Sequence, residues 1–175
     1  MKQTVVLAAL CSFLLFSCKP GKKKMLIGKW NATAIENPYV DSGLMMEKQM
    51  LDTLGKTTTP EQNLALYGTK NIDSLKQDQY AKLDTMINRQ QFVTNNTWFQ
   101  FNEDGSAVLH YGDMDAITTS WHLNDSGKLL LDVIEKSSFA NNLDINIILL
   151  TDSSLRIQQV KNEVSNYISF TKERK

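Results

Sequence analysis

The sequence predicts a mainly β fold: an eight-stranded antiparallel up-and-down barrel with a helical insertion between its first two strands. Three observations predict it. From residue 92 onward, β-branched and aromatic residues dominate, which is typical of strands. Turn clusters such as Asn102-Glu103-Asp104-Gly105 separate these segments at short, regular intervals. Residues 42–91 are instead rich in Leu, Met, Lys, Gln and Asp, which favours helices.

The strand segments are short and carry β-forming residues between clusters of turn residues. All of them fall within one predicted domain, residues 26–172, because the chain is long enough for one sizeable core but hardly for two. The eight strands are predicted at residues 26–36, 94–101, 106–111, 116–123, 128–135, 143–150, 154–160 and 164–171.

The pairing of these strands follows from alternation, because residues facing one another across an antiparallel turn point to the same side of the sheet. With Phe99 and Phe101 taken as inward, a hairpin after residue 102 pairs them with Leu109 and Ala107. Pairing the last strand with residues 26–36 closes the sheet and removes its bare edges. The rule keeps one mainly apolar face through seven strands, pairing Tyr111 with Ile117, Leu109 with Thr119, Ala107 with Trp121, Leu123 with Leu129, Trp121 with Leu131, Thr119 with Val133, Val133 with Ile145, Leu131 with Ile147, Leu129 with Leu149, Leu149 with Leu155, Ile147 with Ile157, Leu155 with Phe170 and Ile157 with Ile168.

The insertion contains a sequence typical of a helix start, Thr59-Pro60-Glu61-Gln62. Thr59 is the N-cap, Pro60 occupies the first helical position and Gln62 is placed for a capping box. Apolar residues with helical spacing predict one helix before this start and one after it. The abundance of methionine in these segments favours core packing over a cofactor site.

The N-terminus has the pattern of an export signal. Lys2 precedes an apolar stretch, residues 5–16, that is too short to span a bilayer. Leu15, Ser17 and Cys18 resemble the lipobox of bacterial lipoproteins, which implies a signal peptide at residues 1–17 and a lipid on Cys18. Two or three acyl chains anchor a protein stably to a membrane. An ordinary secretory signal with an incidental cysteine is the alternative.

The residues after Cys18 are basic, whereas the rest of the domain is acidic. Residues 18–25 are predicted to form a tether whose lysines favour anionic headgroups, and an ordinary linker is the alternative. Surface-displayed lipoproteins of Bacteroidetes have acidic residues after the cysteine. The basic leader therefore indicates a lipid-anchored protein of the cell envelope, in the outer membrane and facing the periplasm.

Three segments together resemble the lipocalin-like domains of Bacteroidetes lipoproteins. They are Gly28-Lys29-Trp30, residues 99–106, and Trp121-His122-Leu123 ahead of the Leu129 strand. The resemblance covers about residues 25–37 and 92–172, and it implies a barrel whose closed end is plugged by Trp30. The helical insertion departs from the pattern, because most such domains have a modest loop there.

Catalytic chemistry has few candidate groups here, and no enzyme activity or cofactor is predicted. His110 and His122 are the only histidines, and the predicted register puts both on the outer face, too far apart to share a metal. We therefore predict no metal site. Basic stripes with interleaved aromatics are missing from the acidic domain, so nucleic acid is not expected as a partner.

The inward aromatic residues leave two hypotheses open. In the first, the barrel binds a small hydrophobic ligand in a pocket lined by Phe99, Tyr111 and Trp121, with the helices over its mouth. In the second, the barrel is solid and the helices bind another envelope protein. The apolar outward residues Leu130 and Ile148 also allow the helices to pack on the outer wall.

Overall fold

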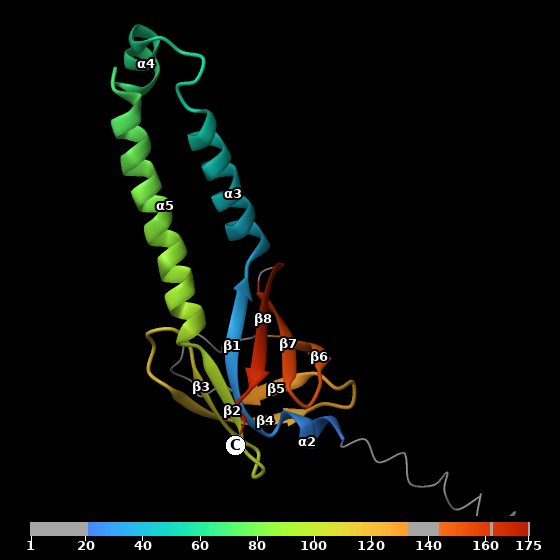
Figure 1. The fold of residues 1–175 in the computed structure, drawn as a ribbon. Coiled ribbons are helices and arrows are strands. Elements are labelled where there is room, and N and C mark those ends of the chain that lie inside the picture. Colours follow the sequence, from blue (N-terminus) through green and yellow to red (C-terminus); the bar gives the residue numbers. More distant parts are fainter. Residues whose placement is uncertain (1–20, 133–143, 162, 175) are drawn as a thin grey trace, which may run out of the picture.

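The barrel is closed. The computed structural model describes residues 21–132, 144–161 and 163–174, and its eight antiparallel strands follow one another in chain order around the barrel (Figure 1). The predicted fold class is confirmed. The strands are β1 (Gly28–Glu36), β2 (Trp98–Phe101), β3 (Ser106–His110), β4 (Ile117–Leu123), β5 (Leu129–Asp132), β6 (Asp144–Leu150), β7 (Ser154–Lys161) and β8 (Val164–Lys172).

Strand β1 closes the barrel, as predicted, because it pairs with both β2 and β8. Trp30 lies opposite Phe99 on one side and opposite Lys172 on the other. A β-bulge between Ala32 and Ala34 shifts the register against β8. The long β1 strand can thus bend around the barrel while it keeps both neighbours.

About half of the predicted cross-strand pairs within the described residues are confirmed. Val133, predicted to pair with Thr119 and with Ile145, lies outside the described residues. The confirmed pairs are Phe99 with Leu109, Phe101 with Ala107, Trp121 with Leu131, Leu123 with Leu129, Ile147 with Ile157, Leu155 with Phe170 and Ile157 with Ile168.

The predicted register between β3 and β4 is wrong by two residues. Leu109 pairs with Ile117, whereas Thr119 was predicted. The strand ends earlier than expected because the chain turns at Gly112, whose backbone N–H donates a 3.2 Å hydrogen bond to Thr97 Oγ1. Side chains alternate between the two faces with a period of two residues. A shift of two residues in the pairing therefore leaves the same side chains facing inward.

The predicted pairing of Leu149 with Leu155 is also wrong. A β-bulge between Ile147 and Leu149 brings Leu150 opposite Leu155 instead. Leu149 is therefore turned outward and is 48% exposed. Alternation cannot reveal such an extra residue, because a bulge reverses the direction of every side chain beyond it.

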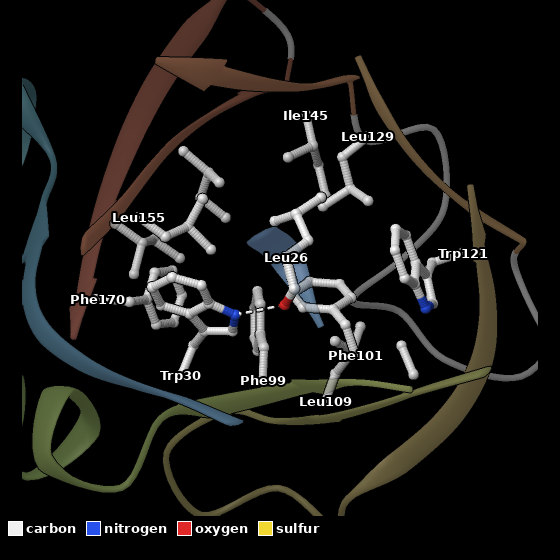
Figure 2. Packing of buried hydrophobic residues seen from close by; sticks show 13 residues of the cluster. Leu26, Trp30, Phe99, Phe101, Leu109, Trp121, Leu129, Ile145, Leu155 and Phe170 are labelled. Carbon is white, nitrogen blue, oxygen red and sulfur yellow. Dashed lines mark hydrogen bonds between the residues drawn. The ribbon is translucent and has the colours of Figure 1, made fainter. Parts of the chain in front are cut away.

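One end of the barrel is closed by the short helix α2 (Lys22–Leu26). It overlaps the predicted tether, residues 18–25, and includes Leu26, which was predicted to begin the first strand. Leu26 is fully buried among the core aromatics, and its carbonyl oxygen accepts a 2.7 Å hydrogen bond from Trp30 Nε1 (Figure 2). Lys172 Nζ donates a 2.8 Å hydrogen bond to the carbonyl of Met25. The last residues of the expected tether are thus part of the folded domain.

The insertion forms three helices, α3 (Pro38–Thr53), α4 (Pro60–Tyr67) and α5 (Ile72–Asn95), and is longer at both ends than the predicted 42–91. The capping box at the start of α4 is confirmed: Gln62 N donates to Thr59 Oγ1, and Thr59 N donates to Gln62 Oε1. Within the described residues, no helix has the length and apolar character needed to cross a membrane.

The helices rise from the end of the barrel opposite to α2 (Figure 1). α3 continues directly from β1, and α5 leads back into β2, so the two helices flank the open end of the barrel, here called the mouth. Ile148, on the outer wall, is 53% exposed. The structure therefore places the insertion at the mouth.

Candidate functional site

A cavity of about 600 Å³ lies at the mouth, between the barrel and the helices. Its walls come from two sources. The barrel and the loop after β3 contribute Ile35, Tyr111, Gln159, Asn166 and Ile168, and the helices contribute Val40, Leu44, Met86, Arg89 and Val93. Asn37, Thr85 and Gln90 complete the lining. Most of the surface that the cavity exposes is nevertheless apolar, so it suits a largely hydrophobic molecule.

Below this cavity the barrel is filled by its own side chains. The Phe99 ring lies 5.0 Å from that of Phe170, and the Phe101 ring lies 5.3 Å from that of Trp121, measured between centroids (Figure 2). Trp121 Nε1 donates a 3.2 Å hydrogen bond to the carbonyl of Asn102. The lower half of the barrel is thus a packed core.

The three residues predicted to line a pocket are divided between these two regions. Tyr111 lines the mouth cavity. Phe99 and Trp121 lie in the packed core, 1% and 3% exposed. Strand β3 ends at His110, so Tyr111 follows the strand and does not continue it as predicted. There it lines the cavity together with Val93 of α5.

Tyr111 contributes a neutral polar group to the cavity wall. Burial raises the pKa of its phenol above the ordinary value of 10.0. A phenol is uncharged at physiological pH even at its ordinary pKa, and this shift makes its ionisation still less favourable.

Gln159, which the sequence did not single out, is the most buried polar residue of the cavity lining. It lies on β7 with its side chain inward, only 6% exposed. Its amide Nε2 is buried and has no hydrogen-bond partner among the residues that the structure describes. Leaving a buried donor unsatisfied costs about 1–3 kcal/mol, so this amide is a candidate contact for a ligand.

Other polar groups at the mouth are already occupied, and they tie the helices to the barrel. Asn37 Nδ2 donates a 2.7 Å hydrogen bond to Asn166 Oδ1 on β8. Gln90 Nε2, on α5, lies 3.3 Å from both the Ile35 carbonyl oxygen and Asp41 Oδ1. These contacts hold α3, α5 and β1 together around the cavity.

Arg89 lies at the rim and is engaged in an ion pair. Its Nη2 atom is 2.7 Å from Asp113 Oδ2, and both side chains are 57% exposed. The hydrogen bond from Arg89 lowers the pKa of the Asp113 carboxyl. The guanidinium therefore points to the surface loop after β3, away from the floor.

The two histidines lie on the outside of the barrel, as predicted. The His110 ring stacks on Trp98 at 5.5 Å, and its Nδ1 is 2.6 Å from the Asn96 carbonyl oxygen. His122 is exposed on β4. Across the described part of the chain, no group of three or more His, Cys, Asp or Glu residues could hold a metal ion. Cys18 lies outside the described residues.

No family model and no curated protein matches the chain. Among solved structures, a crystal structure of a DUF4847 family protein from Bacteroides vulgatus is similar, with 11% sequence identity and a TM-score of 0.41, covering 88% of this chain and 98% of that chain. The closed barrel of this chain is established by its own strand pairing.

Proposed function

We propose that the chain is a lipid-anchored envelope protein whose lipocalin-like barrel binds a small hydrophobic molecule at its mouth, without catalysing a reaction. One observation carries the proposal, the mouth cavity of about 600 Å³ with its mainly apolar wall. Small-molecule sites typically measure roughly 300–1,000 Å³ and combine an apolar lining with a few polar groups. Gln159 is such a polar group.

The proposed anchor is consistent with the orientation of the domain. Cys18 precedes α2 by four residues, a stretch that spans at most about 14 Å when extended. Because α2 closes the end opposite to the mouth, a lipid on Cys18 holds the closed end near the membrane surface. We propose the outer membrane, with the domain in the periplasm and the mouth directed away from the lipid.

The proposed ligand site is tested with two neighbouring substitutions on α3. Leu44 lines the cavity, whereas the adjacent Met45 is 60% exposed. Purified protein is titrated with the apolar fluorescent probe N-phenyl-1-naphthylamine. Leu44→Trp is expected to weaken probe binding at least tenfold by filling the cavity, while Met45→Trp leaves it unchanged. Equal binding by all three proteins contradicts a mouth site.

A second candidate function is binding to another envelope protein, and the exposed apolar side chains of the insertion favour it. The part of the helices farthest from the barrel, residues 46–84, is here called the distal hairpin. It exposes Met46, Met50, Leu64 and Leu66, each at least 48% accessible. Exposed apolar side chains that gather into one patch are typical of protein–protein contacts.

The second candidate is tested by replacing the distal hairpin with a short Gly-Ser linker. The residues lining the cavity lie outside this segment, so probe binding is expected to persist. A protein cross-linked to the wild type in native membranes, and lost from the shortened variant, would support an interaction role. If the same proteins are captured with and without the distal hairpin, that role is excluded.

A further inference from the structure

We propose that the molecule bound at the mouth carries an uncharged hydrogen-bond acceptor, such as an ester, amide or ketone carbonyl, which accepts from the Gln159 amide at the cavity floor. This inference rests on the proposed ligand site and names the chemistry of its ligand. The apolar body of the molecule then extends outward between α3 and α5.

The placement of Gln159 is the first argument. On β7 the preceding inward residues, Leu155 and Ile157, are almost fully buried in the apolar core. Gln159 follows in the same alternation and marks the level where the core ends and the cavity begins. Its backbone is fixed on both sides by pairing with Ile145 and Asn166. An amide held so firmly in an apolar setting is well placed to bind an acceptor.

The lack of a partner for Gln159 is the second argument. Its Nε2 is buried and unpaired within the described part of the chain. Among the other amides that line the cavity, those of Asn37 and Gln90 donate to protein acceptors, and that of Asn166 accepts from Asn37 through its Oδ1. An acceptor on the ligand therefore gains a hydrogen bond at Gln159 without displacing an existing protein contact.

The charges of the site are the third argument, and they favour an uncharged acceptor. Of the cavity-lining residues that the structure describes, Arg89 alone carries a charge, and it is paired with Asp113 at the exposed rim. The Tyr111 phenol is neutral at physiological pH, and burial raises its pKa further above 10.0. A carboxylate at the floor would lose its hydration with no cation beside it, which is costly. A carbonyl avoids that cost.

The arrangement of apolar residues gives the ligand a direction. Ile35 and Ile168, paired on β1 and β8, form the barrel side of the cavity near Gln159. Leu44 on α3 and Val93 on α5 line the side of the helices. A molecule with its carbonyl on Gln159 thus places its hydrocarbon chain along these side chains toward the opening.

The experiment compares three ligands of equal chain length, methyl decanoate, ionised decanoate and decane, as competitors of N-phenyl-1-naphthylamine on the full chain. On the wild type, the ester is expected to compete about five- to tenfold more strongly than the alkane, the gain typical of one hydrogen bond. Decanoate is expected to compete more weakly than the ester. Equal competition by ester and alkane, or stronger competition by decanoate, overturns the inference.

The near-isosteric Gln159→Met variant supplies the control. Its own affinity for the probe is measured first, so that each competitor is compared with decane on the same protein. The variant is expected to lose the preference for ester over alkane, a ratio that does not depend on how tightly the probe itself binds. A preference retained in this variant assigns the acceptor contact to another residue and overturns the inference while the mouth site stands. A wild type that binds no probe refutes the proposed ligand site itself.

A second readout needs only the wild-type protein. Methyl decanoate labelled with ¹³C at its carbonyl is added, and its infrared carbonyl stretch is recorded. Binding is expected to lower the frequency below that of the ester in hydrocarbon, because a hydrogen bond weakens the C=O bond. An unshifted band for the bound ester contradicts the contact with Gln159.

Discussion

The indole Nε1 of Trp30 donates a 2.7 Å hydrogen bond to the carbonyl oxygen of Leu26, and both residues are fully buried. This bond joins α2 to β1 at the centre of the barrel floor (Figure 2). Carbonyl groups at the C-terminal end of a helix have no partner within the helix, so the indole satisfies one that would otherwise be buried unpaired. The closed end of the barrel thus depends on residues that precede the first strand.

We predict that Trp30→Phe destabilises the protein by about 2–4 kcal/mol, because it leaves a small cavity and an unsatisfied Leu26 carbonyl. The free energy of unfolding is measured by chemical denaturation. The control is Trp98→Phe, because Trp98 is only half-buried on the outer face of β2 and should cost about 1 kcal/mol or less. Equal losses in the two variants would show that the indole contact to α2 is unimportant.

The contribution of α2 itself is measured with Leu26→Ala. Leu26 is fully buried, so the truncation is expected to lower the free energy of unfolding by about 2–5 kcal/mol. Leu66→Ala is the matched control, since Leu66 is 65% exposed on α4 and should be nearly neutral. If Leu26→Ala behaves like the control, α2 contributes nothing to the folded domain, as expected of the tether that was predicted at residues 18–25.

Burial of the Tyr111 phenol should make the free energy of unfolding depend on pH in the alkaline range. Burial raises its folded-state pKa above the ordinary value of 10.0, so the folded chain holds this proton after the unfolded chain has lost it. The stabilisation is complete below pH 10 and is lost as pH rises through the folded-state pKa. The free energy of unfolding should therefore fall less steeply above pH 10 in Tyr111→Phe than in the wild type. Parallel curves would contradict burial of the phenol.

Much of the fold could be predicted because alternation is preserved across tight turns. The hairpin at Gly105 joins β2 to β3 without irregularity, and its pairs, such as Phe101 with Ala107, are confirmed. The error between β5 and β6 has another origin. Leu129 pairs with Ile145, four residues from the predicted Leu149, because alternation fixes only which side a residue faces and not how far the strands are staggered.

The candidate site was less predictable than the fold. Inward aromatic residues can line a ligand pocket or fill the core, and the sequence does not distinguish the two. Phe99 and Trp121 pack against other core rings. The alternation of β7 could have identified Gln159. It is a polar residue at the next inward position after Leu155 and Ile157. The contribution of α3 and α5 depends on their tertiary position over the mouth, which the period of a helix does not specify.

Native mass spectrometry of the protein, purified from its own membranes in mild detergent, tests the proposed mouth site most directly. The wild type is expected to carry a small non-covalent adduct, which organic extraction releases and which Leu44→Trp lacks. Met45→Trp should retain it. A wild type without any adduct, or an adduct that Leu44→Trp keeps at the same occupancy, would contradict a ligand in the mouth cavity.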